Sequence, residues 1–237
     1  MIISKELLLS SVKPFGVDLT EKQLEMFDIY AQMLLEWNKR FNLTAIKEPD
    51  DIVLKHFTDS LFIMKSVKFE RKQKLIDVGT GAGFPGLPLL IANNELDVTF
   101  LDSTGKKLNF ISAVLDELSL CGTTIVGRAE DLGQKQEYRE KFDFSTARAV
   151  SELKVVSELC LPLTKPGGTF IAMKGSKALD EASEAEKSIK LLGGIIEKTE
   201  SLTLPSAGER NVFLIKKISQ TPTRYPRNFS QISKHPL

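Results

Sequence analysis

The spacing of apolar side chains changes near residue 70 and divides the chain into two regions. Before that point apolar residues recur every three or four positions, which predicts amphipathic helices. One helix is predicted to begin at a capping box of Thr20 and Gln23, and a second after Pro49. Their apolar faces carry Leu24, Phe27, Tyr30, Ala31, Leu34 and Leu35, then Ile52, Val53, His56, Phe57, Ser60, Leu61 and Met64. We therefore expect residues 1–69 to form a helical cap, with Trp37 sealing the first face.

From Lys74 onward, short apolar runs alternate with helical segments, a pattern typical of a parallel sheet flanked by helices. The sequence predicts five such strands, at 74–78, 97–102, 123–127, 142–147 and 168–174. An amphipathic helix at 177–192 follows. Two more strands, at 195–203 and 211–218, are joined by a loop with Pro205 and Gly208 and are expected to close the sheet edge as an antiparallel pair. The predicted fold class is α/β, with a core at 70–218 and a basic tail at 219–237.

The first predicted strand runs into a glycine-rich loop. Asp77 is followed by Gly79, Gly81, Gly83 and Gly86 in the segment DVGTGAGFPG. Glycines at these places let the backbone approach a nucleotide-like ligand closely. A tight turn between strand and helix is the alternative interpretation, but three glycines at every second position exceed what a turn requires.

The carboxylate beside this loop indicates which cofactor binds. Gly81, Gly83 and Gly86 also satisfy the G-x-G-x-x-G pattern of dinucleotide-binding proteins. The charge of Asp77 would then face a pyrophosphate at close range, which is unfavourable in a partly desolvated cleft. S-adenosylmethionine carries an ammonium group and a sulfonium and has no phosphate. The loop therefore favours S-adenosylmethionine over NAD.

Two further strand ends carry candidate cofactor ligands, because ligands of open α/β sheets bind outside the carboxyl ends of the strands. Asp102 follows the glycine loop by about twenty residues, where a carboxylate can accept hydrogen bonds from both ribose hydroxyls. Its alternative role is the N-cap of a helix that begins near Gly105. Ala129 and Glu130 follow the third strand, where an adenine edge could be read, although they also suit the acidic first turn of a helix.

Positive charge gathers at the ends of the fourth and fifth strands. Arg148 could clamp an acceptor phosphate or stack on a base, and a structural ion pair with Glu152 is its alternative role. Lys174 and Lys177 extend the same rim.

His56 and Asp59 could act together as a catalytic acid–base pair, because they lie close together on a predicted helix. A lone histidine among apolar neighbours is more often a hydrogen-bonded packing residue. The sequence favours that role for His56.

Composition narrows the class of protein further. The net charge of +1 says little, but residues 211–237 contain no Asp or Glu and carry Lys216, Lys217, Arg224, Arg227 and Lys234. This distribution of charge suits contact with a polyanion, or a solvated tail.

Cys121 and Cys160 lack metal-ligand or disulfide-framework spacing and are expected to be small core residues. No apolar run reaches membrane-spanning length, so we expect a cytoplasmic protein with no membrane segment and no metal.

A group of motifs along nearly the whole chain resembles one family. They are Trp37-Asn38, Asn42-Leu43-Thr44, His56 with Asp59 and Ser60, the loop 77–86, Asp102-Ser103, Ala147-Arg148-Ala149, Arg210-Asn211 and Tyr225-Pro226-Arg227. Together they resemble the bacterial 16S rRNA methyltransferase G family, also called glucose-inhibited division protein B. The resemblance implies a Rossmann-like class I S-adenosylmethionine-dependent methyltransferase fold with a mostly parallel seven-stranded sheet. It also implies methylation of N7 of a guanine in the 530 loop of 16S rRNA.

The resemblance also assigns residues. Gly79 and Phe84 would contact the cofactor, Ala129 and Glu130 would lie beside its adenine, and Arg148 would stand at the active cleft. The full predicted set is Asp77, Gly79, Gly81, Gly83, Phe84, Asp102, Ala129, Glu130 and Arg148 for the cofactor, and Lys174, Arg224 and Arg227 for RNA. The partner would be 16S rRNA or the small ribosomal subunit, bound by a monomer. The tail departs from the family, which commonly has a basic residue, a glycine and a proline where this chain has Asn228, Ser230 and Ile232.

The implied chemistry needs no general base, because guanine N7 has an unprotonated lone pair at neutral pH. Arg148 is therefore expected to position RNA or cofactor and not to accept a proton.

Three rival functions stay open. The protein could be a methyltransferase that acts on another RNA, a protein or a small molecule, an NAD-dependent oxidoreductase, or a non-catalytic RNA-binding protein. Retention of Gly79, Gly81, Gly83 and Asp102 disfavours the last of these.

Overall fold

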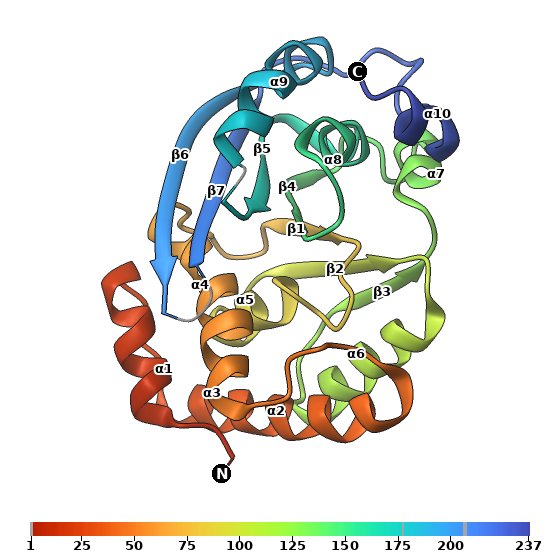
Figure 1. Cartoon of the computed structure of the whole chain (residues 1–237). Coiled ribbons are helices and arrows are strands. Elements are labelled where there is room, and N and C mark those ends of the chain that lie inside the picture. Colours follow the sequence, from red (N-terminus) through yellow and green to blue (C-terminus); the bar gives the residue numbers. More distant parts are fainter. Residues whose placement is uncertain (1, 177, 206–207) are drawn as a thin grey trace.

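A seven-stranded sheet with the order β3-β2-β1-β4-β5-β7-β6 forms the centre of the computed structural model, which describes residues 2–176, 178–205 and 208–237 (Figure 1). The strands are β1 Lys74–Val78, β2 Asp97–Asp102, β3 Thr123–Val126, β4 Phe142–Arg148, β5 Thr164–Lys174, β6 Gly194–Leu204 and β7 Gly208–Lys217. The first five are parallel, and β7 is antiparallel to both β5 and β6. All the predicted strands and the antiparallel edge are thereby confirmed.

The strand ends differ from the prediction by more than one residue at two places. Gly208 was expected in a loop but begins β7, where it pairs with Leu204. β5 begins at Thr164, four residues early, because Thr164 pairs with Phe142 of β4 before a register irregularity. Both strands therefore include glycine residues that, in the sequence alone, indicate a loop.

Helices cover both faces of the sheet. They are α1 Lys5–Val12, α2 Glu21–Phe41, α3 Pro49–Ile52, α4 Asp59–Leu61, α5 Gly86–Ala92, α6 Gly105–Glu117, α7 Ala129–Gln134, α8 Leu153–Cys160, α9 Ala178–Leu191 and α10 Phe229–Lys234. Helices α1 to α6 contribute to one hydrophobic cluster and α7 to α10 to the other. Alternate residues of β5 point into the two clusters, with Ile171 and Met173 in the first and Phe170 and Ala172 in the second. The sheet is therefore buried on both sides, as parallel sheets usually are.

The predicted capping box fixes both the start of α2 and its place on the sheet. Thr20 and Gln23 bond reciprocally, the Gln23 amide proton donating to Thr20 Oγ1 and the Thr20 amide proton to Gln23 Oε1. The side-chain amide of Gln23 also donates to the carbonyls of Ile91 and Ala92, each at 3.0 Å. Trp37, near the other end of the helix, packs 5.5 Å from the ring of Phe110, as expected. The amino-terminal helices thus share one hydrophobic core with the sheet.

The helix predicted after Pro49 is not regular. Between α3 and α4 the chain forms a π-helical stretch, Val53–Thr58, and the chain continues through a short 3-10 segment, Phe62–Lys65. π-helical turns are rare and are frequently found at functional sites. Here the widened turn carries His56.

Several expectations from composition need correction. Cys160 is buried as predicted, but Cys121 is exposed. Lys217 is fully buried, where its ammonium donates to Leu161 O and Thr221 Oγ1 and pairs with Glu140, so it offers no charge to a polyanion. The tail is packed and not merely solvated, since Tyr225 and Ile232 belong to the second cluster. Lys177 lies outside the described residues, and no described helix is long and apolar enough to cross a membrane.

Candidate active site

A cavity of about 280 Å³ opens where β1, β2, β3 and β4 end. It brings together four predicted cofactor residues, Gly79, Asp102, Ala129 and Glu130. Its lining also includes Ser103, Thr104, Lys107, Arg128, Ala149, Val150 and Phe229. The predicted convergence of the strand ends on one ligand-sized space is present in the fold.

The glycine loop borders this cavity at Gly79. The backbone there has a φ of +69°, which disfavours any other residue, and an added Cβ would lie 2.8 Å from Val150 Cγ2. The amide of Gly79 donates to Leu101 O at 2.8 Å, which ties the loop to β2. Gly79 is thus favoured chiefly by its backbone conformation, and an added side chain would also have to displace Val150.

Asp102 lies at the end of β2 and is 6% exposed. Its Oδ2 accepts from the Gly81 amide at 3.1 Å and lies 3.4 Å from Lys107 Nζ, and its Oδ1 accepts from the Thr104 amide at 2.9 Å. The N-cap residue of α6 is Thr104, so Asp102 is not the helix cap that was its alternative role. Its carboxylate joins the glycine loop to the cavity, while ribose binding stays a prediction.

Asp77 lies beneath the loop and is fully buried, outside the cavity lining. Its Oδ2 accepts from Thr80 Oγ1 at 2.6 Å and from the Gly86 amide at 3.0 Å, whereas its Oδ1 has no hydrogen-bond partner among the described residues. Burial raises the pKa of Asp77 to about 6. Its charge would therefore reach a ligand through the thin glycine backbone.

Glu130 and Ala129 open α7, directly after its N-cap residue Arg128. Both line the cavity, and burial raises the pKa of the Glu130 carboxyl. The first-turn role and the proposed position beside adenine are compatible in this geometry.

A second cavity, of about 330 Å³, adjoins the first. Its polar lining consists of Lys55, His56, Asp59, Arg148, Lys174, Arg210 and Asn211. Ala149, directly after β4, lines both cavities. Two ligand spaces of different chemistry therefore meet at the end of one strand.

Arg148 is held in the second cavity by groups far away in the sequence. Its Nη1 donates to Asp59 Oδ2 at 2.9 Å and to Lys55 O at 3.1 Å, and its Nη2 donates to His56 Nδ1 at 3.0 Å. The guanidinium carbon lies 4.8 Å from the centre of the Phe84 ring. The suggested ion pair with Glu152 is wrong, because the carboxylate that pairs with Arg148 is that of Asp59.

His56 is the hydrogen-bonded, buried residue that the sequence favours. Its Nε2 lies 2.8 Å from Thr44 Oγ1, and its ring stacks on that of Phe84 with centroids 4.3 Å apart. Because a guanidinium can only donate, Nδ1 accepts from Arg148 and Nε2 carries the hydrogen. Burial and the charge of Arg148 lower the pKa of His56 to about 3, so the ring is neutral at physiological pH.

Thr44 and Asn38 complete this chain of contacts, and motif reasoning gave them no role. The Asn38 side-chain amide donates to Thr44 O at 2.8 Å, and the Thr44 amide donates to Asn38 Oδ1 at 2.9 Å. Their presence in the family motif is the one signal that could have pointed to them. They anchor His56, and through it Arg148, to the end of α2.

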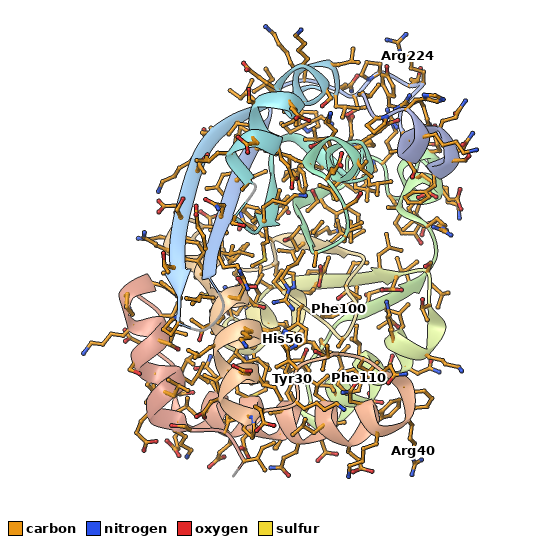
Figure 2. The ribbon with its side chains drawn as sticks, viewed as in Figure 1. Tyr30, Arg40, His56, Phe100, Phe110 and Arg224 are labelled. Carbon is orange, nitrogen blue, oxygen red and sulfur yellow. The ribbon has the colours of Figure 1, made fainter. Side chains whose placement is uncertain are left out.

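Phe84 borders neither cavity directly. It is 5% exposed and stacks between Tyr30, at a centroid distance of 5.4 Å, and His56. Figure 2 shows His56, Tyr30 and Phe110 in the layer between α2 and the sheet. Phe84 forms the floor under Arg148, and its contact with a cofactor stays a prediction.

The three predicted RNA-binding residues differ in how free their charges are. Lys174 donates to Ser151 O and pairs with Glu181 at 2.8 Å. Arg227 makes two side-chain bonds to the fully buried Glu158, at 2.9 and 2.6 Å. Arg224 is exposed at the edge of the molecule (Figure 2). Of these three, Arg224 presents the most accessible charge.

The strand order, the antiparallel β7 and the glycine loop after β1 define the fold of class I S-adenosylmethionine-dependent methyltransferases. A chain from the solved complex between the Haloferax volcanii Trm112 methyltransferase activator and a methyltransferase superposes with a TM-score of 0.58 at 13% identity, over 78% of this chain and 98% of that one.

The sequence gives the family. The family described as rRNA small subunit methyltransferase G matches residues 23–212. Proteins named ribosomal RNA small subunit methyltransferase G from Alkaliphilus oremlandii and Bacillus velezensis are 44% and 45% identical, each over 98% of this chain and 98% of the relative. The chain belongs to this family of methyltransferases.

Proposed function

We propose that this protein transfers a methyl group from S-adenosylmethionine to N7 of a guanine in the 530 loop of 16S rRNA. The observation that carries the proposal is the pair of cavities that meet at Ala149. The first suits a nucleoside cofactor and the second a base with its phosphate. Relatives of this chain are named as methyltransferases of small-subunit ribosomal RNA. The proposed substrate lies in the bacterial cytoplasm.

The residues of the first cavity fit a cationic nucleoside without phosphates. The carboxylates of Asp102 and Glu130 line it, and Asp77 lies under the loop with one oxygen that has no hydrogen-bond partner in the described parts of the chain. Asp102 would accept hydrogen bonds from the ribose hydroxyls, and Ala129 and Glu130 would face the adenine edge. A pyrophosphate would meet these carboxylates unfavourably. S-adenosylmethionine supplies, when bound, an electrophilic methyl group on a positively charged sulfur.

The second cavity orients its substrate and does not remove a proton. Guanine N7 is unprotonated at neutral pH, so its lone pair can form the new bond to carbon as the bond from carbon to sulfur breaks. Both ring nitrogens of His56 are hydrogen-bonded, and its low pKa makes it a poor base. Catalysis is then mainly positional, which can supply roughly 7–11 kcal/mol of barrier reduction in well-oriented systems.

Charged groups in the second cavity suit the phosphate of the acceptor nucleotide. Asp59 lies at the cavity wall, where its carboxylate is flanked by Arg148 at 2.9 Å and Arg210 at 3.4 Å. Burial raises the pKa of Asp59, and the two guanidinium groups act in the opposite direction. The carboxylate holds both guanidinium groups at the wall, where they offer contacts for the phosphate of the target nucleotide.

The target guanine must leave any helix that holds it. The major groove of A-form RNA, where N7 lies, is too deep and narrow for side chains. An unpaired or flipped base could enter the second cavity with N7 directed at Ala149, on the boundary with the cofactor.

The decisive experiment compares ribosomal RNA from cells with and without this gene by chemical cleavage at N7-methylguanine. We expect cleavage in the 530 loop to disappear with the gene and to return with a plasmid copy. Persistent cleavage would mean that the acceptor is a different molecule. Protection of the purified protein from heat by NAD, and not by S-adenosylmethionine, would instead support an oxidoreductase.

A further inference from the structure

An open groove of about 420 Å³ lies outside both cavities, between the end of α2 and the start of α6. It is lined by Glu36, Trp37, Arg40, Phe41, Lys106 and Asn109. None of these residues touches the cavities that the proposed reaction uses. The groove combines two aromatic rings with two cationic side chains.

The aromatic floor of the groove is exposed yet anchored. Phe41 is 39% exposed, and its ring centre lies 5.6 Å from that of Trp37. Trp37 in turn packs 5.5 Å from Phe110, which is fully buried in the core. A ring held in this way can receive a planar partner with little loss of conformational freedom.

The charges of the groove are available to a ligand. Lys106 Nζ lies 5.9 Å from the centre of the Phe41 ring. Neither Arg40 nor Lys106 has an ion-pair partner in the described parts of the chain, whereas Glu36 is paired with Lys39. Figure 2 shows Arg40 pointing from the lower edge of the ribbon into solvent. The net charge around the exposed ring is therefore positive, which complements a polyanion.

The groove is close to the proposed active site along the chain on both sides. Lys106 directly precedes Lys107, which lines the first cavity. Phe41 precedes Ile46, a wall residue of the second cavity, by five residues, so their Cα atoms are at most ~18 Å apart. An RNA whose guanine occupies the second cavity can thus reach Phe41 within a few nucleotides.

We propose that this groove is a stacking site for an unpaired nucleotide of the RNA that flanks the target guanine. The base lies on the Phe41 ring, and its phosphates lie beside Arg40 and Lys106. Aromatic stacking with flanking cations is how proteins hold single-stranded nucleic acid without reading its sequence. The inference rests on the proposed function for the identity of the RNA. It adds a second point of attachment that keeps the target loop open.

The first test changes the ring and keeps its apolar bulk. Phe41→Leu is compared with the unaltered protein on small ribosomal subunits from cells that lack the gene, with labelled S-adenosylmethionine. We expect KM for the subunits to rise about tenfold, within the range measured for loss of one stacked base. The kcat and the calorimetric affinity for S-adenosylmethionine should not change. An unchanged KM would overturn the proposal.

The second test addresses the cations. Filter binding of a synthetic 530-loop RNA is measured against salt for the double variant Arg40→Ala and Lys106→Ala. Loss of two phosphate contacts should reduce the slope of log affinity against log salt by about 1.4. Lys190→Ala is the matched control, because Lys190 is exposed on α9 at the opposite end of the molecule (Figure 1). An equal slope for the double variant and the control would contradict the phosphate contacts.

A photo-cross-link identifies what lies on the groove. Phe41 is replaced with p-benzoylphenylalanine, and the protein is irradiated on small subunits. An adduct in the 530-loop region of the RNA is expected, and an adduct on a ribosomal protein, or none, would overturn the proposal. If the unaltered protein binds the RNA but transfers no methyl group, the proposed function fails while the cross-link still decides the occupant of the groove.

Discussion

The guanidinium of Arg148 and the imidazole of His56 lie against the same ring, that of Phe84, and share a hydrogen bond of 3.0 Å. Arg148 ends β4, His56 lies in the π-helical stretch before α4, and Phe84 belongs to the glycine loop. Three segments that are far apart in sequence thus fix one cation at the wall of the second cavity. The amino-terminal helices are part of the site and do more than cover it.

This arrangement predicts that Arg148→Ala lowers single-turnover methyl transfer at least about 100-fold, because small misplacements of a substrate carry losses of that order. Arg148→Lys keeps the charge but cannot bond to both Asp59 and His56. Its rate should therefore lie between that of the unaltered protein and that of Arg148→Ala. Calorimetric titration with S-adenosylmethionine checks that the first cavity is intact in both variants. Near-normal turnover of Arg148→Ala would remove this residue from the site.

His56 predicts a specific dependence of stability on pH. Its pKa is about 3 in the folded protein and ~6.5 when unfolded, so between these values only the unfolded chain takes up the proton. Stability should therefore fall as pH is lowered through this window, by about 2 kcal/mol from pH 7 to pH 5. Urea unfolding of His56→Gln should lack this contribution. His235→Gln is the control, because His235 is exposed. If His56→Gln keeps the full dependence of stability on pH, the assignment to His56 is contradicted.

Asp77 makes opposite predictions for binding and for stability. Asp77→Asn should weaken binding of S-adenosylmethionine about tenfold at pH 8, because the negative charge under the loop is lost. In the unaltered protein, affinity should fall as pH drops through about 6, where Asp77 takes up a proton.

The stability of the same variant separates this effect from misfolding. The folded pKa of Asp77 is raised, so the stability that the protonated carboxyl contributes is present below ~3.8 and lost as pH rises through about 6. Asp77→Asn should therefore unfold at a higher temperature than the unaltered protein at pH 8. A variant that binds normally would refute the electrostatic argument for the cofactor.

The tail predicts different results for its two arginines. Arg227→Ala leaves the buried Glu158 carboxylate without its guanidinium partner, with only the amide of residue 227 still donating to it, and should lower the free energy of unfolding by about 3 kcal/mol. Arg224→Ala should leave stability unchanged, because this side chain is exposed, and should reduce the salt dependence of RNA binding by about one contact. Denaturation curves and filter binding separate the two effects. Equal behaviour of both variants would show that the structural and RNA-facing roles are not divided in this way.

The strands and the glycine loop were predictable because their signals are local. β1 and β2 are short strands of largely apolar residues, and an acidic residue, Asp77 or Asp102, marks the carboxyl end of each. The positive φ angles of Gly79, Gly81 and Gly83 are likewise written in the residue type. The first cavity follows from these ends because parallel strands align their carboxyl ends at one edge.

The second cavity was not predictable from periodicity, because its partners come from distant segments. Arg148 has a carboxylate four residues away, in Glu152, and an ion pair with that neighbour was the alternative role that the sequence suggested for it. The fold instead supplies Asp59, which is 89 residues away. The predictions for Lys217 and Cys121 are wrong for a related reason. Residue type alone predicts an exposed lysine and a buried cysteine. Lys217 is instead buried, because Glu140 and Thr221 provide partners for its ammonium group.

Phe229, in the first turn of α10, lines the first cavity beside Arg128. The wall of that cavity is consequently unfinished until the ribosome has translated past codon 229. A nascent chain cannot present the complete wall while α10 is still within the exit tunnel. Docking of α10 beside Arg128 is therefore the step that completes the first cavity during synthesis.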